Sequence, residues 1–444
     1  MSDETMTPPR AGWKRDTTVF LSGQTVSMFG SMLVQYAIMW HLTLETKSGV
    51  VLMASAIFGM LPQAIVSIFG GVWADRLNRK VLIIAADASI ALTTLALAVF
   101  MMLGYYELWL IYLTLAIRST GAGIQSPAVM ALIPQLVPTD KLLRVNGIFQ
   151  SIQSGIMLIS PAAAAGIYAS MSIVAVFWVD VVTAIIGIGL LLLIHVPTVR
   201  TVVDTGYFTD LALGVRYTFT HRFVRWLLVL FAIVFVLSVA PSMLTPLMVV
   251  RSFGDEVWML TVNELAFSVG MLGGGVLVAV WGGLKNKVVT VLAASVIFGA
   301  LSIALGLSTN MWVFFGFMLL VGVAVPFFST PSTTLLQERV DPEYQGRVFG
   351  FVGVVMATAM PIGMLVFGPL ADVVSVESLL IVAGLITFVV VLTAALIPAG
   401  RRAIALGAEP APAQDAGDEP AGEAPEGEGT AASASPEEPV PAGG

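Results

Sequence analysis

The feature that most constrains this chain is a series of twelve apolar stretches, each long enough to cross a lipid bilayer. A membrane-spanning helix needs about 20 mostly apolar residues and satisfies its own backbone hydrogen bonds in hydrocarbon. The 444 residues have a mean hydropathy of +0.92 and only 11% charge, whereas soluble domains carry about 25%. We therefore predict an all-α membrane protein with spans near 17–40, 49–73, 81–103, 108–133, 146–169, 172–195, 225–250, 257–282, 288–308, 311–336, 348–371 and 378–398.

The basic residues indicate how these spans are oriented. If residues 1–16 form a cytoplasmic leader, 18 of the 21 Lys and Arg residues fall in inside segments. Outside loops then hold only Lys47 and Arg251, while Arg118 lies within the fourth span. Because basic residues accumulate on the cytoplasmic side of membrane proteins, we expect a multi-pass protein of the plasma (inner) membrane with both termini in the cytoplasm.

The spans divide into two groups of six at a long basic loop, residues 197–224. The second group repeats the first: Trp73-Ala-Asp-Arg-Leu-Asn-Arg79 aligns with Trp281-Gly-Gly-Leu-Lys-Asn-Lys287, and Arg144-Val-Asn-Gly147 with Arg347-Val-Phe-Gly350. Repeats of this kind place a substrate site between them near the midplane. We predict a leader at 1–16, six-helix bundles at 17–196 and 225–398, a central cytoplasmic loop at 197–224, and a disordered acidic cytoplasmic tail at 399–444.

A short charged loop joins the second and third spans and reads Gly-x-x-x-Asp-Arg-x-x-Arg-Lys from Gly71 to Lys80. Glycine lets helices approach closely, and basic residues hold the loop at the cytoplasmic surface. The loop resembles the one between the second and third helices of major facilitator transporters, and this resemblance implies a gate that docks on the opposite half when the protein opens outward. We expect the gate to comprise Gly71, Asp75, Arg76, Arg79, Lys80 and Arg144.

A more specific resemblance comes from four further segments: Ile117-Arg-Ser-Thr-Gly-Ala-Gly-Ile-Gln-Ser-Pro-Ala128, Asn263-Glu-Leu-Ala-Phe-Ser-Val-Gly-Met-Leu-Gly-Gly274, Gln337-Glu-Arg-Val-Asp-Pro-Glu-Tyr-Gln-Gly-Arg-Val-Phe349 and Pro369-Leu-Ala-Asp372. They resemble Mef-type macrolide efflux transporters from about Trp13 to Pro398. The resemblance implies the major facilitator fold of twelve helices in two pseudo-symmetric bundles, export, and coupling to protons. Related exporters carry siderophores or other amphiphiles, so the cargo stays open. The Gly-Pro pair that is common in the fifth helix of drug–proton antiporters is replaced here by Ser160-Pro161, so this antiporter signature is incomplete.

Ionisable side chains within the spans are candidates for coupling because charge in hydrocarbon is costly. Glu264 lies about seven residues into the eighth span, roughly 10 Å deep. Burial disfavours its charged form, so it could exchange a proton near neutral pH, neutralise a cationic substrate, or serve only in packing. Asp180 could be a second proton carrier or part of a structural pair. Arg118 could bias the protonation of a nearby acid or form a structural ion pair, and for Asp87 we expect a local pair with Arg76 or another loop cation, with a role in transport as the alternative.

Two polar stripes lie on single helical faces. In lipid, such a stripe must face protein or water. They are therefore either walls of a substrate cavity or surfaces for hydrogen bonding between helices. The stripes comprise Gln24, Met28, Ser31 and Gln35 in the first span, and Asn146, Gln150, Gln153 and Met157 in the fifth.

Several function classes are excluded. The chain has no cysteine, and its three histidines are too scattered for a metal site. It has no phosphate-binding Gly-Lys-Ser/Thr loop, and its basic clusters form no nucleic-acid face. We predict a monomeric efflux transporter, without cofactor and not an enzyme, that exchanges amphiphilic, macrolide-like drugs for protons by alternating access. Export of a siderophore or metabolite, or a non-transporting scaffold that uses the tail, are the alternatives.

Overall fold

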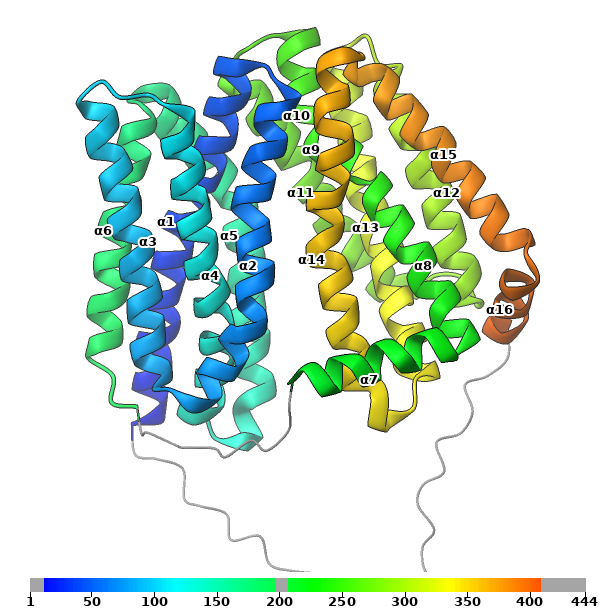
Figure 1. The fold of residues 1–444 in the computed structure, drawn as a ribbon, viewed down its shortest axis with the longest axis horizontal. Coiled ribbons are helices and arrows are strands. Elements are labelled where there is room, and N and C mark those ends of the chain that lie inside the picture. The colour runs from blue at the N-terminus through cyan, green and yellow to red at the C-terminus, as the bar shows by residue number, and fades with distance from the viewer. Residues whose placement is uncertain (1–11, 197–206, 409–444) are drawn as a thin grey trace, which may run out of the picture. The chain divides into compact units, whose positions relative to one another are not determined.

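The computed structural model describes residues 12–196 and 207–408, and within them the chain forms helices and no strand (Figure 1). Ten helices in this described part are long and apolar enough to cross a membrane. Helices α1 (Trp13–Thr46) and α4 (Leu108–Leu136) have the length but carry more polar side chains, such as Gln24 and Arg118. The twelve predicted spans therefore all correspond to helical segments.

The first six spans form one bundle and the last six form another (Figure 1). The seventh span is interrupted, because Pro241 and Pro246 lack the amide hydrogen that a continuing helix requires. The N-terminal bundle contains α1, α2 (Gly49–Arg76), α3 (Arg79–Met102), α4, α5 (Leu142–Ser170) and α6 (Ile173–Leu192). The C-terminal bundle contains α8 (Arg222–Leu237), α9 (Val239–Met243), α10 (Thr245–Met248), a π-helical turn (Val249–Phe253), α11 (Val257–Trp281), α12 (Lys287–Gly306), α13 (Met311–Arg339), α14 (Pro342–Val373) and α15 (Val376–Leu396).

Glycines allow close contacts between helices inside each bundle, and two of these contacts lie in matching places. In the first bundle, a Cβ atom added to Gly70 of α2 would lie 2.5 Å from the carbonyl oxygen of Gly123 in α4. In the second, a Cβ atom on Gly274 of α11 would lie 2.4 Å from the carbonyl oxygen of Val323 in α13. The two bundles therefore repeat the same packing, as expected for internal repeats.

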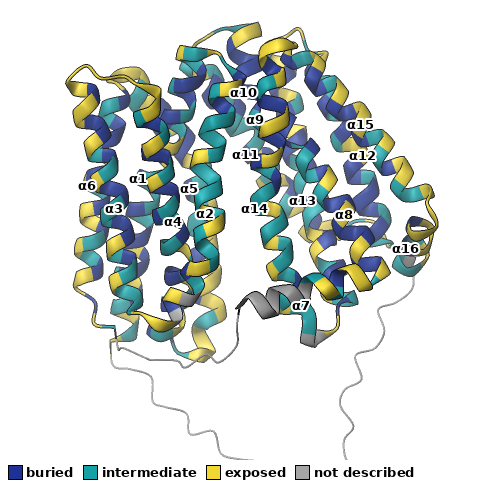
Figure 2. Cartoon of the chain, viewed as in Figure 1, coloured by how far each residue is buried: buried dark blue, intermediate teal, exposed yellow. Residues whose placement is uncertain are grey.

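Exposed residues lie along the outward faces of the spans (Figure 2), and many of them are large and apolar. Leu92 is 64% exposed, Ile185 is 64% exposed and Val280 is 83% exposed. A soluble protein rarely exposes a continuous apolar surface of this size. These faces are therefore the ones that contact lipid.

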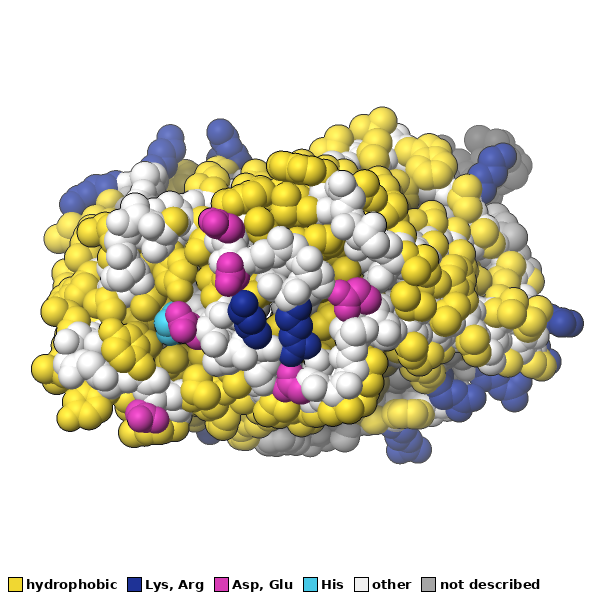
Figure 3. All heavy atoms as spheres, turned by 90° about the horizontal axis from the view of Figure 1, so that it is seen from above, with side chains coloured by type: hydrophobic (Ala, Val, Ile, Leu, Met, Phe, Trp, Pro, Cys, Tyr) yellow, Lys and Arg dark blue, Asp and Glu magenta, His cyan; other side chains and the backbone are white. Residues whose placement is uncertain are grey.

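Two opposite ends of the helical body are named here by the helices that lie there. The α10 end, seen in Figure 3, has a few acidic side chains around two basic ones. These are Glu45, Glu107, Asp255, Glu256, Asp372 and Glu377 around Lys47 and Arg251. The α7 end carries the α2–α3 turn, α7 (Tyr207–Thr220) and α16 (Pro398–Ala408) (Figure 1).

Helices α7 and α16 differ from the sequence-based expectations. The predicted loop 197–224 contains α7, where the Tyr217 ring stacks on Tyr344 at 4.6 Å and its hydroxyl group donates to Asp341 Oδ2 at 3.0 Å. The predicted disordered tail from residue 399 begins with α16, because Ala403 is buried against α8. Residues 1–11, 197–206 and 409–444, and the predictions made for them, lie outside the described part.

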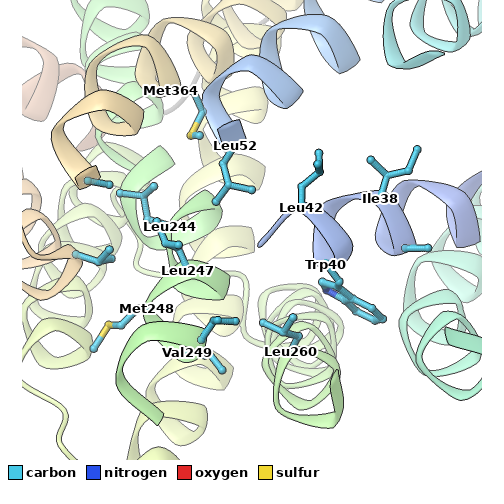
Figure 4. Packing of buried hydrophobic residues seen from close by; sticks show 14 of the residues in the cluster. Ile38, Trp40, Leu42, Leu52, Leu244, Leu247, Met248, Val249, Leu260 and Met364 are labelled. Carbon is cyan, nitrogen blue, oxygen red and sulfur yellow. The ribbon is translucent and has the colours of Figure 1, made fainter. Parts of the chain in front are cut away.

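Among the described residues, the buried apolar side chains form three clusters, and one of these is shared by the two bundles. At the α10 end, Trp40 and Leu52 of the first bundle pack with Leu244, Leu247 and Leu260 of the second (Figure 4). At the α7 end, one cluster belongs wholly to the first bundle and another wholly to the second. The bundles are thus joined through their cores at the α10 end and have separate cores at the α7 end.

Candidate functional site

Among the described side chains, a carboxylate near the C-terminal end of α14 accepts the most hydrogen bonds from the opposite bundle. The hydroxyl group of Ser48 donates to Asp372 Oδ2 at 2.8 Å. The backbone N–H groups of Gly49 and Val50 donate to the same carboxylate at 2.7 and 3.0 Å. The first turn of a helix has free N–H groups and a positive partial charge. Asp372 therefore caps the N-terminus of α2 from the opposite bundle.

Arg251 extends this contact to a third and a fourth segment. Its Nη2 donates to Asp372 Oδ1 at 2.9 Å and to the carbonyl oxygen of Lys47 at 2.5 Å. Its Nη1 donates to the carbonyl oxygen of Ala371 at 2.5 Å. Lys47 itself pairs with Asp255 at 3.3 Å. We call Asp372, Arg251, Ser48, Gly49 and Val50 the α2–α14 latch.

Close backbone packing makes this latch possible. A Cβ atom on Gly49 would lie 2.2 Å from the carbonyl oxygen of Gly368. A Cβ atom on Gly368 would lie 2.5 Å from the Cβ atom of Met53. Larger residues at either glycine would separate α2 from α14, as at other small-residue contacts between membrane helices.

The bundles are open to their surroundings toward the α7 end. Cβ atoms added to Gly346, Gly350 and Gly353 of α14 would meet nothing within 4 Å, and the same holds for Gly147 and Gly155 of α5. Both helices contact the opposite bundle elsewhere along their length, through α14–α2 and α5–α11. Their halves near the α7 end therefore offer free surface.

The predicted gate residues bond within their own bundle in this conformation. Arg79 donates to the carbonyl oxygens of Ala74 at 2.8 Å and Ala131 at 2.7 Å. Lys80 Nζ donates to the carbonyl oxygens of Leu192 at 3.0 Å and Ile194 at 2.6 Å. Lys80 therefore caps the C-terminal end of α6. Gly71 has free space beside it, Arg76 and Arg144 are exposed, and the Asp75 side chain is outside the described part.

Arg118 and Asp180 meet in the middle of the first bundle. Arg118 Nη1 lies 2.5 Å from Asp180 Oδ2, and the exposed fractions of the two residues are 7% and 1%. Thr94 donates to the same oxygen at 3.0 Å and accepts a bond from Arg118. Ser31 donates to Asp180 Oδ1 at 3.3 Å. Breaking one partner of such a buried pair leaves an uncompensated charge, which is strongly unfavourable.

The expected pair of Asp87 with Arg76 or another loop cation is wrong for the described residues, none of which forms an ion pair with it. Asp87 lies eight residues into α3, roughly 12 Å from the turn, and is only 2% exposed. Gln125 of α4 donates to its Oδ1 at 2.5 Å instead. Its Oδ2 is buried without a hydrogen-bond partner among the described residues, as is Oε1 of Gln24. The interior of the first bundle is thus more polar than the loop-based reasoning allowed.

Glu264 stands at the interface of the bundles. It is partly exposed on α11, and Tyr36 of α1 lies within electrostatic range of its carboxylate. None of the described residues gives it a hydrogen bond or an ion pair. The neighbouring Asn263 is 1% exposed, and neither of its amide atoms has a partner in the described part. Glu264 and Asn263 are therefore two neighbouring polar side chains without a fixed hydrogen-bond partner among the described residues.

The two predicted polar stripes have different surroundings. In α5, Asn146 and Gln150 are exposed, and Gln153 and Met157 are partly exposed. In α1, Gln35 is exposed, Met28 and Ser31 are partly exposed, and Gln24 is 1% exposed inside the bundle. The α5 stripe is accessible in this conformation, whereas Gln24 is not.

Sequence reasoning did not assign a role to Asp372, although it quoted the segment that contains it. A signal was available, because an acidic residue at the C-terminal end of a helix opposes the helix dipole and needs another partner. Lys47 and Arg251, which the charge distribution had set apart as outside residues, lie beside it. Their proximity could not be read from positions about 200 residues apart in the chain.

Comparisons with known proteins agree with this architecture. The Major Facilitator Superfamily model matches residues 18–364. Macrolide efflux protein A of Streptococcus pyogenes is 30% identical over 377 residues, which cover 84% of this chain and 93% of that protein. Macrolide efflux protein A of Enterococcus faecalis is 30% identical over 317 residues, which cover 70% and 98%.

Solved structures share the fold at lower identity. The nucleoside transporter NupG superposes with a TM-score of 0.65 at 14% identity, covering 86% of this chain and 98% of that one. A bacterial homologue of the iron transporter ferroportin, in an inward-facing state, gives a TM-score of 0.61 at 17% identity, covering 86% and 99%. These structures support the arrangement of the helices alone.

Proposed function

Because the chain belongs to the major facilitator superfamily, we propose that it is a secondary active transporter that exports amphiphilic, macrolide-like drugs in exchange for protons. The observation that carries this proposal is the 30% identity to Macrolide efflux protein A across 93% of that protein. The adaptable apolar composition fits such cargo, since the chain has 21 methionines and 24 phenylalanines.

Alternating access is supported by the contrast between the two ends. One shared core and the α2–α14 latch join the bundles at the α10 end, whereas each bundle has its own core at the α7 end. We assign the α7 end to the cytoplasm, because basic residues gather there and acidic ones at the α10 end. The structure then corresponds to a state closed to the outside, and the export cycle requires the latch to open.

Glu264 is our first choice for the proton carrier. It lies where the bundles meet, and it has no fixed partner among the described residues. Asp180 is a weaker candidate in this conformation, since Arg118, Thr94 and Ser31 all contact its carboxylate. We infer that these contacts give Asp180 a structural role and that Glu264 is the acid that exchanges protons.

The experiment is macrolide accumulation in cells that express the protein, with and without an uncoupler. We expect low accumulation that rises when the proton gradient is removed. If macrolide accumulation is unaffected by the protein while a deletion strain fails under iron limitation, export of a siderophore replaces the drug proposal. A protein truncated after residue 408 that exports normally would exclude the scaffold alternative.

The choice of Glu264 has its own test. Glu264→Gln should abolish drug-dependent collapse of a pH gradient in proteoliposomes. Glu256→Gln is the matched control, because this exposed carboxylate lies just before the same helix. A Glu264→Gln protein that still exports drug and still collapses the gradient would remove Glu264 from the mechanism.

A further inference from the structure

A groove of about 860 Å³ lies between α8, α15 and α16 at the α7 end, away from the bundle interface. Its apolar walls include Val229 and Ile233 of α8 and Val389 of α15. These side chains are 49%, 39% and 63% exposed, so the groove opens sideways onto the surface that contacts lipid. A groove of this kind can accept an acyl chain without any movement of the helices.

Basic side chains line the same groove. They are Arg222 and Arg225 from the first turn of α8 and Arg402 from α16, and none of the described residues that line the groove is acidic. Arg225 donates to the carbonyl oxygen of Phe219 at 3.0 Å. Arg222 and Arg402 have no hydrogen bond or ion pair with any described residue, and both are exposed. The groove therefore has a positive charge that no described residue compensates.

The spacing of charge and apolar surface matches one leaflet of a bilayer. Arg222 and Ile233 are eleven residues apart on one helix, which corresponds to roughly 16 Å at 1.5 Å per residue. Half of a hydrocarbon core about 30 Å thick is about 15 Å. When the arginines lie at the level of the headgroups, Val229 and Ile233 lie alongside the acyl chains.

The walls of the groove are fixed by internal contacts. Trp226 Nε1 donates to the carbonyl oxygen of Ala394 at 3.0 Å, which ties α8 to α15. Ala403 is 1% exposed and packs in the same cluster as Trp226, which holds α16 against α8. A ligand that bridges Arg222 and Arg402 would therefore join two elements whose positions are already set.

We propose that this groove binds an anionic phospholipid from the leaflet at the α7 end. Arg222 and Arg402 bind the phosphate, and an acyl chain lies along Val229 and Ile233. Guanidinium groups suit this role because they donate two parallel hydrogen bonds to phosphate oxygens. Inorganic phosphate shares the charge but would leave the apolar walls uncovered, so the lipid is the occupant that matches both parts of the groove.

The test is native mass spectrometry of the full-length protein with phosphatidylglycerol or phosphatidylcholine that have the same acyl chains. We expect at least tenfold stronger retention of phosphatidylglycerol, and loss of this preference in Arg222→Gln/Arg402→Gln. The control Arg216→Gln/Arg401→Gln removes the same charge from exposed sites outside the groove and should keep the preference. Equal retention of the two lipids by the wild type, or equal losses in both double variants, would overturn the proposal.

A second variant separates the groove from general charge effects and from folding defects. Val229→Trp fills the apolar wall and leaves every arginine in place, and it should also reduce phosphatidylglycerol retention tenfold. Unchanged retention in this variant, or complete displacement of the lipid by inorganic phosphate at millimolar concentration, would show that the acyl chain takes no part. Either result would contradict the proposed site.

Discussion

The substitution Asp372→Asn tests the α2–α14 latch most directly. The carboxylate accepts hydrogen bonds from Ser48, Gly49, Val50 and Arg251, whereas an amide keeps one oxygen and turns an N–H₂ group toward these donors. Hydrogen bonds to charged groups contribute about 1.5–3 kcal/mol each. The side chain is 28% exposed, so water replaces part of what is lost. We therefore expect closure at the α10 end to weaken by about 2 kcal/mol, roughly thirty-fold in the equilibrium constant.

Because the chain has no cysteine, spin labels can be attached at introduced cysteines without any native cysteine being replaced first. Glu107→Cys and Thr309→Cys place one spin label on each bundle at the α10 end, in the exposed α3–α4 and α12–α13 turns. Pulsed electron–electron double resonance spectroscopy then gives the distribution of distances between the labels. We expect Asp372→Asn to add a population at longer distance that is minor or absent in the parent protein.

The control for this measurement is Asp255→Asn. Asp255 also lies at the α10 end, but its side chain is 68% exposed and contacts Lys47 alone at 3.3 Å. Exposed ion pairs contribute about 0–1 kcal/mol, so this variant should keep the parent distribution. An Asp372→Asn protein whose distances match those of the parent would refute the view that the carboxylate holds the bundles together.

Two further substitutions probe the packing and the buried pair. Gly368→Ala should move the same labels apart, because the new Cβ atom would lie 2.5 Å from the Cβ atom of Met53. Gly353→Ala is the control, because its Cβ atom meets nothing within 4 Å and should leave the distance between the labels unchanged. Equal distances in both variants would contradict the packing argument. Arg118→Met should lower the free energy of unfolding by about 3–5 kcal/mol, because it leaves Asp180 buried without its partner. Adding Asp180→Leu should restore most of this stability in a thermal unfolding assay, and a double variant as unstable as the single one would argue against a buried charge as the cause.

The sequence predicted the spans well because a run of about 20 apolar residues has few alternatives in a bilayer. It did not predict α7 and α16. These helices are stabilised by contacts such as Tyr217 with Tyr344 and Ala403 with the α8 cluster, which join residues far apart in the chain. Composition alone cannot register such contacts.

The candidate site was predictable only in part. Arg118 and Asp180 were singled out because charge in hydrocarbon is costly, and the structure places them together. Their pairing, and the contact of Asp87 with Gln125, depend on how α3, α4 and α6 rotate about their axes. The bonds of Asp372 to residues 322–324 positions earlier in the chain depend on how one bundle docks on the other. No local pattern encodes either quantity.

The partial exposure of the α2–α14 latch also bears on turnover. Ser48 and Asp372 are both accessible to solvent. When the bundles separate in the proposed cycle, water can replace each hydrogen bond that the two side chains lose. A carboxylate sealed in a dry interior would instead face the full cost of losing its partners. In the proposed cycle, a latch at the water boundary can thus hold the bundles together and still open at a moderate cost in free energy.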